Sequence, residues 1–382
     1  MKNLKEWFGL SENRDNFEIE TVDDREYLFA RTEADGKISG ILDRAFQTNR
    51  TAKAVLFGDW GVGKTHTMRH LQYLIENNND YKGLTVFVEL PDILKKSTFQ
   101  VAHSALLDAI GMQNINGWLY NFQTKYQEKT KDEIQNFTQS SDIATGFVSL
   151  LGSGAIQALS WKWLRGEAIT SGDATNFGLT TQLIQSNQMS MVLRFIGRLC
   201  REAKKEALIL MIDECSNIRN VTDADAVSHW KNAFKNLFDP DNKEAGLIIS
   251  VTDNDIDNFP EPISDQQIRT RIGQGNFIML NRFDRDENKD FVKAVLSVAL
   301  DSTKVDALIK QYSAEVDGET IDKATFPFTS EAFEQFLDYT QQNQQAVPRD
   351  TLEFLNEMAN AAIQADKHIL TSEFVNSIGV TS

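Results

Sequence analysis

The chain has 382 residues, of which 41% are hydrophobic and 25% charged, and its formal net charge is −16. This composition fits a globular protein with one large or two ordinary domains, and the acidic balance argues against a broad surface for nonspecific DNA binding. Two cysteines, Cys200 and Cys215, exclude a disulfide framework, and together with an N-terminus that lacks the apolar core of a signal peptide they predict a cytoplasmic protein.

The first expected element is a helix at residues 37–47, which closes an N-terminal extension of residues 1–50. From residue 51 to 281, short runs that are apolar on both faces alternate with helix-length stretches. These runs are "KAVLFG" (53–58), "LTVFVEL" (84–90), "ALILMID" (207–213) and "GLIISVT" (246–252). Continuous apolar strands of this kind are typical of a parallel sheet that is covered on both sides, so we expect an α/β fold.

A long gap separates the second and third of these runs, and we expect it to hold a helical insertion at about residues 112–185. Within it, the segment from Ile143 to Trp161 has no charged residue and approaches the length of a membrane span. Polar residues and glycines dilute it, so we expect burial against protein or a neighbouring subunit and no membrane role. From residue 282 to 382 the patterns are those of amphipathic helices, which predict a separate helical domain.

The stretch "GDWGVGKT" fits the pattern G-x-x-x-x-G-K-[ST] between an apolar strand and a helix. Glycines at this spacing let backbone N–H groups turn toward a phosphate, while a lysine reaches its oxygens and a hydroxyl ligates Mg²⁺. The helix that follows adds the positive end of its dipole. We therefore expect a P-loop in which Lys64 binds phosphate, Thr65 binds metal, and the surrounding residues contact the nucleotide, namely Gly58, Asp59, Trp60, Gly61, Val62, Gly63 and His66.

Two acids end the third apolar run, and they complete this site. Asp213 stands where a P-loop enzyme places a carboxylate that coordinates Mg²⁺. Glu214 follows it and is expected to polarise the attacking water. The sequence thus predicts one site for ATP and Mg²⁺.

Four places in residues 25–365 make the chain resemble the AAA+ ATPases, and among them the origin-recognition and initiator-type ATPases. "FARTEA" (29–34) is similar to the family's box beside the adenine pocket, on Phe29, Arg31 and Glu33, although its glycine is missing. "IISVTDND" resembles the sensor 1 strand, with either Thr252 or Asn254 as the polar residue that orients water.

The other two places supply arginines. "QIRTRIGQGNFIML" resembles the box that carries the arginine finger, so the resemblance implies that Arg271, with Arg269 as second choice, reaches the nucleotide of a neighbouring subunit. "AVPRDTLEFL" resembles the sensor 2 helix, which would make Arg349 a contact of the γ-phosphate in the same chain. A finger from a neighbour makes hydrolysis depend on assembly.

Two departures narrow the expected function. The stretch "ADKHILTSEFVNSIGVTS" after the last lid helix is too short for the winged-helix domain that initiator ATPases usually carry. "WKWLRGEAI" (161–169) is similar to an element of bacterial ATP-binding proteins of BREX-like phage-exclusion systems. Its other reading is a core stripe of Trp161, Trp163 and Leu164 with Arg165 and Glu167 at a solvated edge.

We therefore predict an ATPase that works with Mg²⁺ as a homo-oligomer, in a ring or filament, or within a hetero-assembly. It is expected to act as a switch or assembly factor in a DNA-related machine, such as antiviral defence. One alternative is a DNA-loaded ring- or filament-forming regulator of transposition. Another is a signalling scaffold that holds nucleotide without binding DNA.

Overall fold

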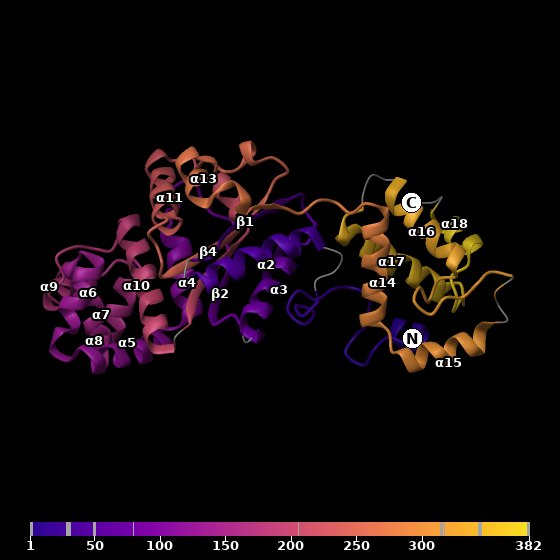
Figure 1. The fold of residues 1–382 in the computed structure, drawn as a ribbon, viewed down its shortest axis with the longest axis horizontal. Coiled ribbons are helices and arrows are strands. Elements are labelled where there is room, and N and C mark those ends of the chain that lie inside the picture. The colour runs from indigo at the N-terminus through magenta and orange to yellow at the C-terminus, as the bar shows by residue number, and fades with distance from the viewer. Residues whose placement is uncertain are drawn as a thin grey trace. The chain divides into compact units, whose positions relative to one another are not determined.

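Five parallel strands form one sheet, in the order β2-β3-β4-β1-β5 (Figure 1). This computed structural model describes residues 3–27, 32–48, 51–78, 80–204, 206–313, 316, 318–342 and 346–379. The strands are β1 (Lys53–Gly58), β2 (Gly83–Glu89), β3 (Ala207–Asp213), β4 (Ala245–Thr252) and β5 (Phe277–Met279). The four predicted strands are confirmed, and the short edge strand β5 is an addition that the sequence pattern does not predict.

Helices cover both faces of the sheet, which explains why its strands are apolar throughout. On one face, alternate strand residues share a core with α4 (Gln100–Ile110), α10 (Ser186–Lys204) and α11 (Ala224–Leu237). On the other face lie α2 (Thr32–Gln47) and α3 (Lys64–Asn77). They come so close to Gly83 that a Cβ there would meet Ile75 of α3 at 2.6 Å and Phe46 of α2 at 3.0 Å.

The predicted insertion is helical and gathers beside α10 (Figure 1). It contains α5 (Met112–Tyr126), η1 (Gln127–Lys129), α6 (Thr130–Thr138), α7 (Ser141–Leu150), α8 (Ala155–Leu164) and α9 (Ser171–Asn176). The uncharged segment forms most of α7 and α8. The expected burial holds for its α7 part, where Phe147 is fully buried, but not for the start of α8, where Ile156 is 51% exposed. Within the described part of the chain, no helix is both long enough and apolar enough to span a membrane.

Short elements connect the larger ones after β3. They are η2 (Cys215–Asn220), η3 (Ile256–Asn258), α12 (Glu261–Ser264), α13 (Gln266–Ile272) and η4 (Gln274–Asn276). The last two lead directly into β5, which pairs with β1 through Val55, Leu56 and Phe57.

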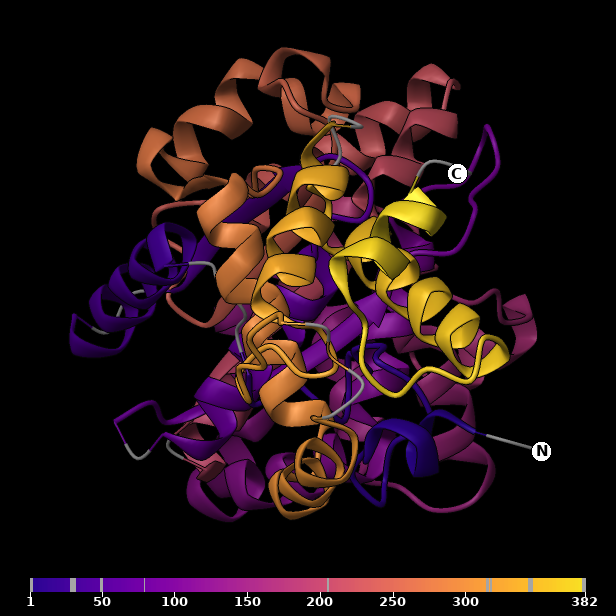
Figure 2. The ribbon, with the colours of Figure 1, turned by 90° about the vertical axis from the view of Figure 1, so that its right-hand side faces the viewer.

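The chain divides into two compact units, and each is built from discontinuous segments. The sheet unit comprises residues 34–58 and 70–279, and the helical unit comprises 1–33, 59–69 and 280–382. The helical unit has its own core, in which α1 (Leu4–Phe8) packs with C-terminal helices. These are α14 (Arg285–Ala299), α15 (Ser302–Tyr312), α16 (Ser330–Gln342), α17 (Pro348–Gln364) and α18 (Ser372–Gly379), drawn in orange and yellow in Figure 2.

The division differs from the predicted domains at the N-terminus and at residues 59–69, which were expected within the sheet core but group with the helical unit. The expected extension of residues 1–50 contributes to both units, because residues before 34 group with the C-terminal helices and α2 groups with the sheet. The change from strands to helices near residue 282 coincides with the return of the chain to the helical unit at Leu280.

Candidate active site

The carboxyl edge of the sheet brings together the ends of the strands that carry the predicted motifs. β1 ends at Gly58, which is in register with Thr252 at the end of β4. β3 ends at Asp213 on the other side of β4. Ligands of open parallel sheets bind outside the carboxyl ends of the strands, at the point where the strand order reverses, so this edge is the candidate site.

The loop after β1 has the backbone that the predicted P-loop requires. Gly61 and Gly63 have φ angles of 80° and 90°, a region that residues with a side chain seldom adopt. Lys64 begins α3 and is only 6% exposed. Its ammonium group donates a hydrogen bond to the carbonyl oxygen of Asp59, at 2.7 Å. The loop therefore curls around its own lysine, ahead of the N-terminus of a long helix.

The residues on either side of the start of α3 differ in their contacts. Val62 is buried and anchors the loop, and Thr67 donates from both its backbone and its hydroxyl to Gly63. The hydroxyl of Thr65 is half-buried and has no hydrogen-bond partner among the described residues, so it is available to a ligand. The ring of His66 lies 2.7 Å from the carbonyl oxygen of Tyr27, an N-terminal contact that the motif does not predict.

Asp213 is 1% exposed, and its two carboxylate oxygens differ. Oδ1 accepts hydrogen bonds from the hydroxyl of Ser250 and from the backbone N–H of Glu214. Oδ2 is buried and has no hydrogen-bond partner within the described part of the chain. A buried anionic oxygen without a partner is unfavourable, and a divalent cation would satisfy it.

The ligand chemistry at this edge fits Mg²⁺. Among the described residues, no three His, Cys, Asp or Glu side chains gather into a metal cage. Mg²⁺ needs no such cage, because it is usually bound by one or two carboxylates together with substrate phosphates and water. Asp213 offers one carboxylate oxygen of this type.

Glu214 has a left-handed backbone conformation, with φ 56° and ψ 36°. A residue with a side chain adopts it at a cost of about 1–2 kcal/mol, and such residues cluster at functional sites. Its backbone N–H is shared between Asp213 and the hydroxyl of Ser250. Ser250 is a hydrogen-bonding partner of this acidic pair that the sequence analysis does not predict, although it is a polar residue inside the apolar run of β4.

The structure separates the two candidates for sensor 1. Thr252 is the last residue of β4, and its backbone N–H donates to the hydroxyl of Ser216, just after Glu214. Asn254 lies beyond the strand, is exposed, and lines a separate cavity with Arg269 and Thr270. Position at the strand end favours Thr252.

In the helical unit, Arg349 lies against the P-loop. It is the second residue of α17, and its guanidinium carbon is 4.0 Å from the centre of the Trp60 ring. A Cβ on Gly61 would approach the side chains of Val347 and Arg349, so glycine is needed there for space as well as for its φ angle. Arg282, which the sequence reading did not select, donates to the carboxylate of Asp59 at 2.7 and 3.0 Å.

Arg271 lies far from Asp213 within the sheet unit. It lies in the last turn of α13 and lines a cavity with Thr51 and Lys53 at the start of β1, on the amino edge of the sheet. Its Nε lies 3.5 Å from a carboxylate oxygen of Asp239, with which it forms an ion pair. The second choice, Arg269, is held by Asp257 and by the carbonyl oxygen of Ile256. Arg271 is therefore the less constrained arginine, and it does not face the carboxyl edge of its own sheet.

Two other predicted stretches are residues 29–34 and residues 161–169. Phe29, Arg31 and the side chain of Glu33 lie outside the described residues. In the stretch 161–169, Trp163 and Leu164 are buried, and the indole N–H donates to Thr181. Arg165 pairs with Asp108 and Glu167 at the surface. These contacts are those of a core stripe with a solvated edge.

No protein-family model and no curated protein matches the sequence. Among solved structures, the chain is similar to the Aeropyrum pernix ORC2 protein in its ADPNP–ADP complexes, with a TM-score of 0.50 and 12% identity over 100% of this chain and 72% of that one. It also matches the A. pernix ORC1 protein in complex with DNA (TM-score 0.46, 10% identity, 93% of this chain) and spans 66% of that protein's length. The Thermotoga maritima RuvB branch migration motor matches with a TM-score of 0.41 and 11% identity, over 91% of this chain and 67% of that one.

At these identities the likeness to ORC2 concerns the fold alone. Together with the parallel sheet, it gives the chain an α/β P-loop NTPase fold with a helical C-terminal region, and the predicted fold class is confirmed.

Proposed function

We propose that this chain binds ATP with Mg²⁺ and hydrolyses it to ADP and phosphate in assemblies of several copies. The observation that carries the proposal is the buried, half-satisfied carboxylate of Asp213 at the carboxyl edge where the P-loop begins. Most buried polar atoms in proteins have a hydrogen-bond partner, so the unpaired oxygen of this carboxylate favours a bound cation.

Each motif residue has a role in this proposal. Lys64 and the backbone N–H groups of residues 58–66 bind the phosphates, and Thr65 and Asp213 bind the metal. Mg²⁺, when bound, neutralises charge on the phosphate oxygens. Glu214 accepts a proton from the water whose oxygen attacks the γ-phosphorus, while the bond between that phosphorus and the bridging oxygen breaks and ADP leaves. Thr252 or Asn254 orients that water.

Two arginines complete the proposed site. Arg349 acts in its own chain, where it already stacks on Trp60 of the P-loop. Arg271 acts on the nucleotide of a neighbouring copy, which agrees with its place on the amino edge of the sheet. Positive charge from a neighbour stabilises the transition state, so turnover requires assembly.

The proposed role is that of a nucleotide-controlled switch or assembly factor in a DNA-related machine, including an antiviral one. It rests on the sequence resemblance to initiator-type ATPases. The net charge of −16 speaks against broad DNA coating, so DNA contact is an outcome of the test below.

The first experiment measures ATP turnover against protein concentration for the wild type and Arg271→Ala, with and without double-stranded DNA. A steep rise with concentration that the variant lacks supports a shared site. Stimulation by DNA favours the DNA-loaded alternative. Tight nucleotide retention with flat, slow turnover that is indifferent to Arg271 overturns the proposal in favour of the nucleotide-holding scaffold.

A mixing experiment tests the trans role directly. Lys64→Ala keeps the finger and loses phosphate binding, whereas Arg271→Ala keeps phosphate binding and loses the finger. Each is expected to be inactive alone, and their mixture is expected to recover turnover at interfaces that pair one good finger with one good P-loop. No recovery on mixing would contradict a trans arginine.

A further inference from the structure

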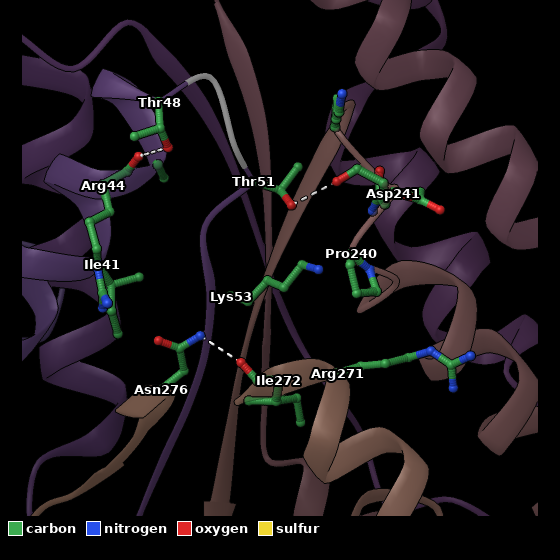
Figure 3. A pocket seen from close by; sticks show the side chains of 13 residues that line it. Ile41, Arg44, Thr48, Thr51, Lys53, Pro240, Asp241, Arg271, Ile272 and Asn276 are labelled. Atoms are coloured by element: carbon green, nitrogen blue, oxygen red, sulfur yellow. Dashed lines mark hydrogen bonds between the residues drawn. The ribbon is translucent and has the colours of Figure 1, made fainter. Parts of the chain in front are cut away.

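A cavity of about 630 Å³ opens at the amino edge of the sheet, away from the P-loop motif (Figure 3). It lies between α2, the start of β1, the loop before β4, and α13 with the turn that follows it. Its volume is within the range of about 300–1,000 Å³ that is usual for sites of small molecules. The proposed function uses one residue of the lining, Arg271, and gives the cavity itself no role.

Positive charge dominates its lining. Arg44, Lys53, Lys243 and Arg271 line the cavity against one carboxylate, that of Asp241, in a chain whose net charge is −16. Within the described residues, neither the guanidinium of Arg44 nor the ammonium of Lys243 has an ion-pair partner, although Arg44 Nε donates to Gly40. Two exposed cations beside one cavity leave it suited to an anion.

Lys53 stands in the middle of this arrangement. Figure 3 shows it between Arg44 and Thr48 on one side and Pro240 on the other. Its ammonium donates to the carbonyl oxygens of Phe238 and Asp239, at 2.8 and 2.7 Å, which leaves its third N–H for another acceptor. Burial lowers the pKa of Lys53 to about 8. A bound anion would favour its charged form.

The uncharged residues that line the cavity indicate which other chemical groups a ligand would have. Ile41, Ala45, Pro240 and Ile272 add apolar surface. The hydroxyl of Thr51 and the side-chain amide of Asn276 already donate to backbone carbonyl oxygens, so the cations supply most of the free donors. Cations beside an apolar wall suit a phosphate group on a carbon framework.

We propose that this cavity binds a small phosphorylated organic molecule, and that the bound molecule engages Arg271. The second half rests on the proposed function. Arg271 is about one-third exposed, and Asp239 at 3.5 Å is its only ion-pair partner among the described residues, so its side chain can turn toward an anion in the cavity. An arginine engaged there is withdrawn from a neighbour's nucleotide, and the ligand thereby lowers turnover.

Binding is tested by calorimetric titration of the full-length Lys64→Ala chain, which silences the P-loop. The probes are ribose 5-phosphate and inorganic phosphate. We expect one site, tighter for ribose 5-phosphate, and weakened about tenfold or more by adding Lys243→Glu or Arg44→Glu, because each reverses a charge at the phosphate. Lys131→Glu, an exposed lysine on α6 of the insertion, is the matched control and should leave the affinity unchanged.

The outcomes separate the two proposals. No binding at millimolar probe, or equal binding by the Lys243→Glu and Lys131→Glu forms, overturns the cavity site whether or not the protein hydrolyses ATP. If ribose 5-phosphate binds, its effect on ATP turnover is measured for the wild-type and Lys131→Glu chains, both expected to be inhibited, and for Lys243→Glu, whose fractional inhibition is expected to fall. Binding without inhibition overturns the link to Arg271 and leaves the site.

Discussion

A single hydroxyl, that of Ser250, orders the acidic pair at the end of β3. It donates to Asp213 and accepts the backbone N–H of Glu214. Removing this hydroxyl leaves the buried Oδ1 of Asp213 with the backbone N–H of Glu214 as its remaining donor among the described residues. The pair Asp213 and Glu214 could be predicted from the sequence. The contact of this pair with Ser250 could not, because Ser250 belongs to another strand, β4.

We expect Ser250→Ala to lower the free energy of unfolding by roughly 1–3 kcal/mol, because a buried charged acceptor loses a donor. Denaturant titration measures this. Ser190→Ala is the matched control, since Ser190 is equally buried but its hydroxyl donates to Ser186, a neutral carbonyl of its own helix. An equal loss of stability in both variants would show that the hydrogen bond to Asp213 contributes no more to the free energy of unfolding than one to a neutral carbonyl.

Two substitutions of Glu214 distinguish the cost of its left-handed backbone conformation from the loss of its proposed role as a base. Both Glu214→Gln and Glu214→Gly remove the proposed base and are expected to lower ATP turnover at least a hundredfold. The glycine form should be the more stable by about 1 kcal/mol, because glycine adopts a φ of 56° without strain. Parallel turnover and denaturant measurements test this. A more stable glutamine form would contradict the strain argument.

At the scale of elements, α4 is tied to the insertion by His103. This residue is fully buried, and its Nε2–H donates to the carbonyl oxygen of Leu164 in α8 at 2.7 Å. Nδ1 has no hydrogen-bond partner among the residues that the structure describes, so it holds a lone pair in apolar surroundings. Protonation would add an N–H without an acceptor.

Burial accordingly lowers the pKa of His103 from 6.5 to about 4. Because the unfolded chain binds this proton more readily, stability is complete above pH 6.5 and falls by roughly 3 kcal/mol as the pH drops toward 4. In His103→Gln, whose amide can still donate to Leu164, the free energy of unfolding should fall less over this interval. Equal slopes for both proteins would contradict the assignment.

Elements with a strong local pattern could be predicted from the sequence. The four long strands are apolar on both faces because helices cover both, and the glycine-rich loop carries its own conformational signature. β5 could not be predicted, because its three residues gain their strand character only from pairing with β1. The stacking of Arg349 on Trp60 and the pairing of Arg282 with Asp59 join residues far apart in the chain, which no local pattern reveals.

At the scale of the molecule, the helical unit gathers three separate stretches of the chain, and its core includes Leu4, Phe8, Leu10 and Phe17 from the N-terminus. These residues are buried there against C-terminal helices. A chain cut after Met279 therefore keeps four apolar side chains that have lost their core.

We expect the fragment 1–279 to aggregate more than the fragment 34–279, because the shorter fragment lacks this exposed apolar set. Light scattering during size-exclusion chromatography at matched concentrations compares them. Both fragments lack the helices after residue 280, so the comparison isolates the N-terminal segment. A monomeric 1–279 fragment would show that the apolar side chains of residues 1–33 are buried elsewhere in that fragment.

The placement of Arg271 on the amino edge and of Asp213 on the carboxyl edge gives the sheet unit a direction. If Arg271 acts on the nucleotide of a neighbour through a head-to-tail contact, the assembly either closes into a ring or continues as an open row. An open row has one terminal copy whose site receives no arginine from a neighbour. That copy hydrolyses its ATP slowly, so a retained ATP distinguishes one end of the row from the other.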